Sequence, residues 1–363
     1  MTTTQERAVA LEEGRATVAP LLEVSGLSVS YAPPRKGVGL GTGAALTEAS
    51  LQVRPGEIVG IVGETGSGKT TLARATVGLV RPAAGRIEFA GQDMGSLRGR
   101  ALRDFRRSGQ VQLVFQDPLR SLDPDLTVAE LVREPLDVAG TLPRTGPGGR
   151  QERVAESLRL VGLDPETMLG RRPRELSGGQ RQRISLARAI STRPKLLFCD
   201  EPVSALDVSN RNLVLSLLDR LRTELGLAVV IIAHDLSSLA GIADRVAVFY
   251  RSRVVEQGPI QAVLERPAHP YTGLLTASAP SVTQVDRLRP DQLRPEPGAR
   301  EWPAHGVCVF AARCRFAHDA CVEQPAPLRL AGDREAACHV AGAWRAQLGT
   351  QVGADDRFHT EES

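Results

Sequence analysis

The stretch Gly63-Glu-Thr-Gly-Ser-Gly68-Lys69-Thr70 is the most informative part of this 363-residue chain. It matches the phosphate-binding loop pattern G-x-x-x-x-G-K-[ST] at every fixed position. Glycines let the backbone curl so that successive N–H groups point at phosphate oxygens, Lys69 adds a point charge, and the Thr70 hydroxyl can ligate Mg²⁺. The apolar run 57–62 predicts a strand before the loop, and residues 71–79 predict a helix after it. We therefore expect the loop at a helix N-terminus, where anions bind best.

The residues expected to contact a nucleotide in this stretch are Gly63, Glu64, Thr65, Gly66, Ser67, Gly68, Lys69, Thr70 and Thr71.

Charge and hydrophobicity limit the partners and the cellular location that can be expected for this protein. The net charge is only +3, which gives no reason to expect nucleic acid or a membrane surface as partner. The first residues lack a basic-then-apolar leader, and the longest apolar run, 227–233, is far shorter than the roughly 20 residues of a membrane span. We expect a cytosolic protein that reaches a membrane only through partners.

Apolar runs alternate with helical patterns along most of the chain, which indicates a parallel sheet covered on both faces. Strands are expected near 21–31, 46–53, 57–62, 85–90, 111–115, 195–199, 228–233 and 245–250. Helices are expected within 126–170, with a Gly/Pro-rich break at 140–149, and at 208–225 and 235–243. Residues 1–20 and 346–363 read as flexible tails, and 281–300 as a Pro- and Arg-rich linker. No internal repeat occurs, so one nucleotide-binding unit is predicted, at 21–258.

A second motif, Leu196-Leu-Phe-Cys-Asp200-Glu201, is an apolar strand that ends in two carboxylates. Such residues lie at the carboxyl edge of the sheet, where ligands bind in open α/β folds. We expect Asp200 to hold Mg²⁺ and Glu201 to polarise the attacking water.

A third motif is Leu176-Ser177-Gly178-Gly179-Gln180. Ser177 and Gln180 fit a helix capping box, but this leaves the two glycines unexplained, because glycine costs helix stability. Close approach of the backbone to a ligand explains them: exposed N–H groups, the Ser177 hydroxyl and the positive helix end form a phosphate clamp. One chain does not need two clamps on one nucleotide. This clamp is therefore predicted to serve a nucleotide bound to a second subunit.

At this order and spacing, the motifs resemble those of the ATP-binding cassette (ABC) family over about residues 21–260. The resemblance implies an α/β P-loop NTPase cassette with a parallel core sheet, an antiparallel β subdomain, a helical subdomain at about 117–192 and a small Cys-rich C-terminal extension. Gly63–Thr70 then corresponds to Walker A, Leu196–Glu201 to Walker B and Leu176–Gln180 to the signature sequence. Ser204-Ala205-Leu206-Asp207 matches the D-loop, which implies a nucleotide contact for Asp207.

The resemblance also assigns single residues. Gln116 matches the Q-loop glutamine that contacts Mg²⁺, His234 the switch histidine at the γ-phosphate, and Tyr31 the aromatic that stacks on adenine. The residues alone leave alternatives open: Gln116 satisfied by backbone, a structural His234 at a strand end, and Tyr31 in the core. The implied mechanism sandwiches ATP between Lys69 of one subunit and Ser177–Gln180 of another, so that ATP joins two cassettes and hydrolysis separates them.

Two further segments indicate which branch of the ABC family the chain resembles. Residues 116–124 and His269-Pro270-Tyr271-Thr272-Gly-Leu274-Leu275 resemble oligopeptide/dipeptide permease ATPases. This implies an importer subunit at the cytoplasmic face of the membrane, for dipeptides, oligopeptides or a related solute such as nickel. Its partners would be a second cassette, expected to be a distinct but similar subunit, two transmembrane permeases and an extracytoplasmic binding protein. A soluble ABC ATPase uncoupled from transport and an iron–sulfur redox-responsive ATPase are the alternative readings.

Four cysteines lie close together in the chain: Cys308, Cys314, Cys321 and Cys338. Disulfides are not expected in a reducing cytosol, so the cysteines suggest a metal site. Their gaps of five, six and sixteen residues are wider than those of common zinc ribbons, and four thiols suit a cubane iron–sulfur cluster.

The segment around them resembles the C-terminal domain of the peptide-permease ATPases, here expected at 259–345, and some members of that group carry a [4Fe–4S] cluster. Zn²⁺, with His318 or His339 replacing one thiol, and free thiols remain alternatives. Cys199, inside an apolar strand, is expected to be a small core residue.

Overall fold

The computed structural model describes residues 19–31, 44–117, 121–203, 208–278, 288–303, 307–326, 328–331 and 334–348. Most of both expected tails lies outside these residues. So do the D-loop residues 204–207, including Asp207, and the first part of the expected linker.

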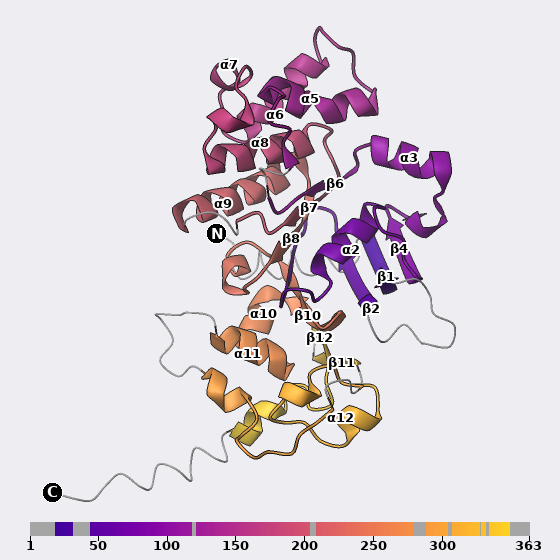
Figure 1. Ribbon diagram of the computed structural model, residues 1–363, viewed down its shortest axis with the longest axis vertical. Coiled ribbons are helices and arrows are strands. Elements are labelled where there is room, and N and C mark those ends of the chain that lie inside the picture. Colours follow the sequence, from indigo (N-terminus) through magenta and orange to yellow (C-terminus); the bar gives the residue numbers. More distant parts are fainter. Residues whose placement is uncertain are drawn as a thin grey trace, which may run out of the picture.

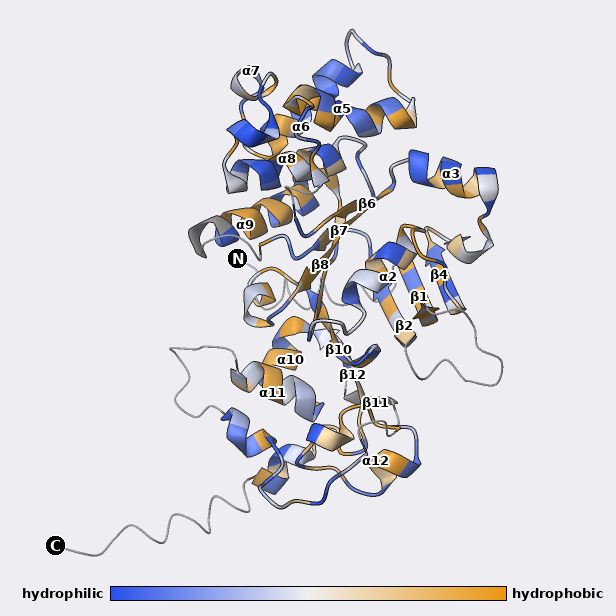
Figure 2. Cartoon of the chain, viewed as in Figure 1, coloured by the Kyte–Doolittle hydropathy of each residue, from blue (hydrophilic) through white to orange (hydrophobic). Residues whose placement is uncertain are grey.

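An eight-stranded sheet runs through the centre of the molecule in the order β11-β12-β10-β9-β3-β8-β7-β6 (Figure 1). Its parallel part consists of β6 (Val111–Val114), β7 (Leu196–Asp200), β8 (Ala228–Ala233), β3 (Ile58–Gly63) and β9 (Arg245–Tyr250). Every residue of β3, β7 and β8 is buried, as coverage on both faces requires. Figure 2 shows these strands as a hydrophobic band inside polar helix surfaces.

Three antiparallel strands that the sequence did not predict extend this sheet: β10 (Arg253–Pro259), β12 (Arg334–Ala337) and β11 (Leu328–Ala331). Glu256 of β10 pairs with Ala336 of β12. The C-terminal region is therefore continuous with the core sheet, and the expected domain boundary at residue 258 falls within β10.

A second, antiparallel sheet has the order β2-β1-β4-β5. Its strands are β1 (Leu22–Ser30), β2 (Ala44–Val53), β4 (Ala84–Phe89) and β5 (Gln92–Asp93). Its buried face shares one apolar cluster with α2 (Lys69–Thr76) and with one face of the core sheet, through residues such as Val59, Leu72 and Phe198. This packing holds the phosphate-loop helix between the two sheets.

A helical part forms one end of the molecule (Figure 1). It contains α5 (Val128–Ala139), α6 (Arg150–Leu160), α7 (Pro165–Met168) and α8 (Gly178–Ile190). α5 begins at a capping box between Thr127 and Glu130 and ends at Gly140, whose φ is 68°. The expected break at 140–149 therefore lies between α5 and α6, with glycine in the left-handed conformation that ends a helix.

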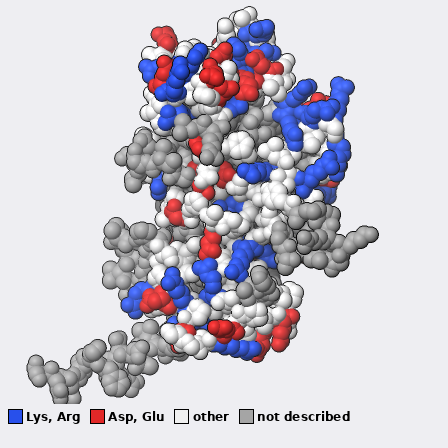
Figure 3. Space-filling view, in the orientation of Figure 1, with Lys and Arg blue, Asp and Glu red and all other residues white. Residues whose placement is uncertain are grey.

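The remaining helices lie on the flanks and in the C-terminal region. They are α3 (Gly99–Arg107), α9 (Val208–Leu225), α10 (Ile260–Glu265), α11 (Pro270–Ser278) and α12 (Ala320–Glu323). Short 3₁₀ turns span 94–96, 173–175, 237–239, 290–293 and 311–313. The sequence did not predict α3, whose exposed arginines form the basic area at the upper right of Figure 3. None of the described helices is long and apolar enough to cross a membrane.

The expected helix at 235–243 is only a 3₁₀ turn at Ser237–Leu239. The Asp235 carboxylate accepts hydrogen bonds from the Ser238 amide at 2.7 Å and the Ser237 hydroxyl at 2.9 Å. Such local side-chain bonds offer the backbone an alternative to a helix.

Candidate nucleotide-binding site

The phosphate-binding loop lies against neighbouring strands, which leave no room for a side chain at its first glycine, Gly63, or at its last, Gly68. A Cβ on Gly63, at φ 150°, would lie 2.0 Å from the carbonyl oxygen of Phe249. A Cβ on Gly68, at φ 100°, would lie 2.4 Å from the carbonyl oxygen of Ala45. Glycine is needed at both positions for backbone conformation and for space.

Lys69 is buried in the loop, with a relative exposure of 6%. Its Nζ donates to the carbonyl oxygens of Gly63 at 2.8 Å and Glu64 at 2.9 Å. Burial lowers the pKa of Lys69, while the charges of Glu201, Asp200 and Glu64 oppose this shift. α2 begins here after Gly68, which has no side chain to cap the first-turn N–H groups. These groups can donate to an anion.

Asp200 ends β7 beside the loop and is 4% exposed. Burial raises the pKa of Asp200, and a hydrogen bond from the Thr70 side chain opposes this. Its Oδ1 atom is buried and has no hydrogen-bond partner among the described residues, and the same holds for Ser67 Oγ. A buried carboxylate oxygen that lacks a donor, next to a threonine hydroxyl, fits a hard cation such as Mg²⁺.

Glu201 lies between two other residues singled out in the sequence. His234 Nε2 is 2.6 Å from Glu201 Oε1, and the Gln116 side-chain amide donates to Glu201 Oε2. Glu201 adopts φ 49°, a conformation that non-glycine residues rarely take and that often occurs at functional sites. The three residues follow β6, β7 and β8, and all three side chains meet at the carboxyl edge of the parallel sheet.

The surroundings of Gln116, His234 and Tyr31 bear on the alternatives that the sequence left open for these residues. Gln116 pairs with a carboxylate, and the side chain of His234 is 46% exposed, so neither is a buried structural group. Tyr31 is 58% exposed, and its hydroxyl lies 3.4 Å from Thr71 Oγ1, so it is not a core aromatic. Its ring is open to stacking at the edge of the loop.

The motif 176–180 begins α8, in the helical part, whereas the phosphate-binding loop begins α2 beside the core sheet (Figure 1). Ser177 Oγ accepts from the Gln180 amide at 3.2 Å, and Gln180 Oε1 accepts from the Ser177 amide at 2.9 Å. The capping box is thus present. A Cβ on Gly178 would meet nothing within 4 Å, so packing within this chain does not require glycine there.

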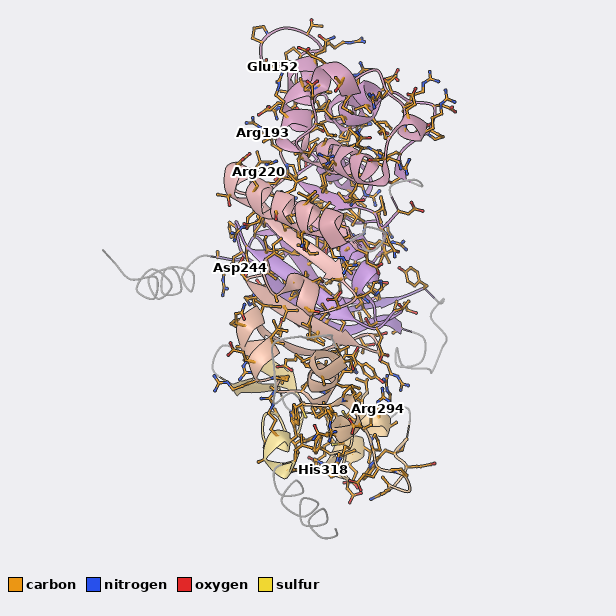
Figure 4. The ribbon with its side chains drawn as sticks, turned by 90° about the vertical axis from the view of Figure 1, so that its left-hand side faces the viewer. Glu152, Arg193, Arg220, Asp244, Arg294 and His318 are labelled. Atoms are coloured by element: carbon orange, nitrogen blue, oxygen red, sulfur yellow. The ribbon has the colours of Figure 1, made fainter. Side chains whose placement is uncertain are left out.

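The four C-terminal cysteines belong to the segment 307–340, whose His318 lies at the end of the molecule opposite Glu152 (Figure 4). Cys308 donates its amide to the Cys321 carbonyl at 2.9 Å, and Cys321 Sγ is 3.4 Å from His318 Nδ1. Burial raises the pKa of Cys308, Cys314 and Cys338, and neighbouring thiols add to the rise.

No three or more Cys, His, Asp or Glu side chains are arranged to hold a metal ion in the described part of the chain. Cys199, as expected, is fully buried in β7.

One part of the loop's surroundings was missed at the sequence level. Arg313, next to Cys314, donates to Glu64 Oε1 at 2.7 Å, and the Tyr271 hydroxyl accepts from the Glu64 amide at 3.2 Å. The segment 269–275 stood out in the sequence only through its resemblance. No local pattern could link Arg313 to Glu64, because 249 positions separate them.

The chain is similar to known proteins along most of its length. The ABC transporter family model matches residues 46–204, and the oligopeptide/dipeptide transporter C-terminal region matches residues 255–321. A putative peptide import ATP-binding protein of Brucella abortus (strain 2308) is 42% identical over 303 residues, covering 82% of this chain and 86% of that protein. A probable peptide ABC transporter ATP-binding protein of Sinorhizobium fredii is 43% identical over 298 residues, covering 82% of each chain.

Solved structures agree as well. An ATP-binding cassette, solved as a dimer bound to ADP and Pi in a post-hydrolysis state, is 28% identical with a TM-score of 0.57 and covers 66% of this chain and 98% of its own. A part of the cbiONQ transporter complex from Clostridium perfringens is 28% identical with a TM-score of 0.59, covering 68% and 91%. The chain therefore belongs to the ABC transporter family of ATPases, in the branch that carries the oligopeptide/dipeptide transporter C-terminal region.

Proposed function

We propose that this ATPase powers an importer for dipeptides, oligopeptides or a related solute such as nickel. The observation that carries the proposal is the convergence of Lys69, Asp200, Glu201 and His234 at one sheet edge, in a chain that continues into the transporter-type C-terminal region. The relatives described as peptide import ATP-binding proteins support the same class of solute.

At the proposed site, Lys69 and the first-turn N–H groups of α2 bind the terminal phosphates of ATP. Thr70, Asp200 and Gln116 hold Mg²⁺, which neutralises phosphate charge when bound. Glu201 orients the attacking water. His234, hydrogen-bonded to Glu201, fixes that carboxylate and contacts the γ-phosphate. Tyr31 stacks on the adenine ring.

A second cassette completes the site. Ser177–Gln180 is exposed at the start of α8, with open space around Gly178, so it can approach a nucleotide held by another chain. The related cassette solved as a dimer supports this pairing. We propose a distinct but similar subunit as the partner, with Asp207 close to the shared nucleotide.

Two transmembrane permeases would dock on the groove between the core sheet and the helical part. That groove is lined by Gln112, Leu113 and Phe115 after and along β6, by Pro135 of α5 and by Arg188 of α8. Phe115 is 41% exposed there, which suits an inserted apolar helix end. The chain would then sit at the cytoplasmic face of the membrane, and an extracytoplasmic binding protein would deliver the solute.

We further propose that Cys308, Cys314, Cys321 and Cys338 hold a [4Fe–4S] cluster that stabilises the small C-terminal region. Four thiols, three of them buried, are a donor set of the right number and kind. No three of them are arranged to hold a metal ion among the described residues, so the proposal rests on their number and chemistry alone. Zn²⁺ is the competing occupant, with His318 beside Cys321 as a fourth ligand.

The transport proposal is tested by co-purifying the chain with its permeases and reconstituting the complex in vesicles. Peptide supplied with its binding protein should stimulate ATP turnover and accumulate inside. Turnover that no peptide or nickel stimulates, in a complex that still binds ATP, would contradict the assigned solute class.

A further inference from the structure

The Cys-rich segment reaches the phosphate-binding loop directly. Arg313 Nη1 lies 2.7 Å from Glu64 Oε1, and Glu64 is the second residue of the loop. Both side chains of this ion pair are 46% exposed, so the contact is partly solvated. Arg313 immediately precedes Cys314 in the chain. A residue of the C-terminal region is therefore a direct neighbour of the ATP site.

A second contact fixes the backbone at the same residue. The Tyr271 hydroxyl accepts a hydrogen bond from the Glu64 amide at 3.2 Å. Tyr271 is fully buried, and its ring packs against Tyr250 and Phe310, with ring centroids 4.5 Å and 5.4 Å away. Arg313 Nη1 also lies 3.3 Å from the Tyr250 hydroxyl. The two groups that hold Glu64 thus share one aromatic cluster.

Buried hydrogen bonds hold the residues directly before α11, the helix that carries Tyr271. The Glu256 carboxylate accepts from the amides of Ala268 and His269, each at 2.8 Å, directly before α11. Trp344, fully buried, donates its indole N–H to the Ala268 carbonyl at 2.9 Å. Positioning groups act well only when their own supports are fixed, and these supports come from β10 and the C-terminal segment.

The charge of Glu64 would oppose nucleotide binding if it were not compensated. Its carbonyl oxygen accepts from Lys69 Nζ, and its carboxylate is one of three charges that act on Lys69. A free carboxylate at this place repels the phosphates of ATP and competes for the lysine. Arg313 pairs with that carboxylate at 2.7 Å and offsets its charge.

We propose that Arg313 and Tyr271 are positioning residues of the ATP site, which hold Glu64 against the C-terminal region so that the loop accepts a polyphosphate. The C-terminal region then forms part of the nucleotide site, and the affinity for ATP depends on its correct folding.

Binding of Mg-ATP to the full isolated chain, measured with a fluorescent ATP analogue, tests this without any transport step. Arg313→Gln should weaken binding about threefold, the scale of one exposed ion pair. Glu64→Gln should tighten it by a similar factor, because Arg313 is then uncompensated. The double variant Glu64→Gln/Arg313→Gln restores the net charge and should bind ATP as the wild type does.

Arg315→Gln is the matched control, because Arg315 flanks Cys314 on the other side and pairs with Glu296 instead. It should leave ATP affinity unchanged. Tyr271→Phe keeps the buried ring and removes only the acceptor for the Glu64 amide, so it should weaken binding with little change in melting temperature.

A double variant as weak as Arg313→Gln would overturn the proposal, since a merely structural arginine cannot be rescued at Glu64. Equal ATP affinity in Arg313→Gln and Arg315→Gln would overturn it too. The Glu64 side chain is exposed, so Glu64→Gln should fold and can be tested even if Arg313→Gln does not fold. Unchanged or weaker ATP binding in Glu64→Gln would contradict the proposal.

Discussion

His234 Nε2 lies 2.6 Å from Glu201 Oε1, at the ends of two neighbouring strands, β8 and β7. Gln116, after β6, reaches the other oxygen of the same carboxylate. The Glu201 carboxylate, after β7, is thus held from two sides by two side chains that follow the strands β8 and β6. A general base needs such orientation, because its efficiency depends on geometry before pKa.

Glu201→Gln should lower ATP turnover by roughly a hundredfold or more, because it removes the group that we propose orients the attacking water. ATP binding at Lys69 should persist, so paired cassettes should accumulate with ATP on size-exclusion chromatography. Glu224→Gln, in an exposed pair with Arg220 on α9, is the control and should behave as the wild type. Residual turnover within a few-fold of wild type would count against the assigned role.

Ser177→Arg should abolish turnover in the assembled pair and leave ATP binding to the isolated chain intact, because the bulky cation would block the clamp that we propose acts on the partner's nucleotide. Ser177→Ala adds neither bulk nor charge to the clamp, and its stability gives the cost of losing the helix cap. It loses only the hydroxyl that accepts from Gln180, which should cost about 1 kcal/mol of stability. Unchanged turnover in Ser177→Arg would refute the shared clamp.

Gly63→Ala and Gly66→Ala distinguish lack of space from backbone strain in the loop. Gly66 has φ 80° and open space around it, so alanine there should cost only about 1–2 kcal/mol of left-handed strain. Alanine at Gly63 adds a clash with the Phe249 carbonyl and should destabilise the nucleotide-free protein further. Urea unfolding without nucleotide measures both; equal losses would show that the strands move apart easily.

Cys308→Ser should prevent the C-terminal region from holding the proposed [4Fe–4S] cluster. Anaerobically purified wild type should be brown, with roughly four irons per chain, and the variant should lose them. Cys199→Ala changes a thiol buried in β7 and should keep the iron. A colourless wild type with a single zinc would reassign the occupant, and a metal-free wild type would leave the thiols free.

His269 should make stability depend on pH. Burial lowers the pKa of His269 from 6.5 to about 3, so between these values the unfolded chain binds a proton that the folded chain excludes. The contribution of neutral His269 to the free energy of unfolding is therefore fully present above pH 6.5 and is lost as pH falls below that value.

Between pH 6.5 and 5.5, the wild type should lose about 1 kcal/mol more than His269→Asn, whose amide oxygen can still accept from the Tyr271 amide. Urea unfolding at the two pH values gives this difference, in which the other titrating groups largely cancel. Parallel losses in both proteins would show that His269 is protonated when folded.

The sequence alone determined the cassette, because its signals are local. A strand, a glycine loop and a helix occupy consecutive residues at 58–76, and burial on both faces makes the parallel strands continuously apolar. The positions of Asp200, Glu201 and His234 followed from the same rule, since residues after parallel strands share one edge.

Tertiary structure alone decided how the C-terminal region joins the cassette. β10 and β12 pair across some 78 positions of chain, and Arg313 meets Glu64 across 249. Such contacts leave no periodicity in the sequence, because they depend on packing between distant elements. The helix that the sequence predicted at 235–243 is absent for a local reason. The Asp235 carboxylate accepts a hydrogen bond from the Ser238 amide, and this short-range bond outweighs a weak helical pattern. Local chemistry thus specifies the phosphate loop, and long-range packing decides what surrounds it.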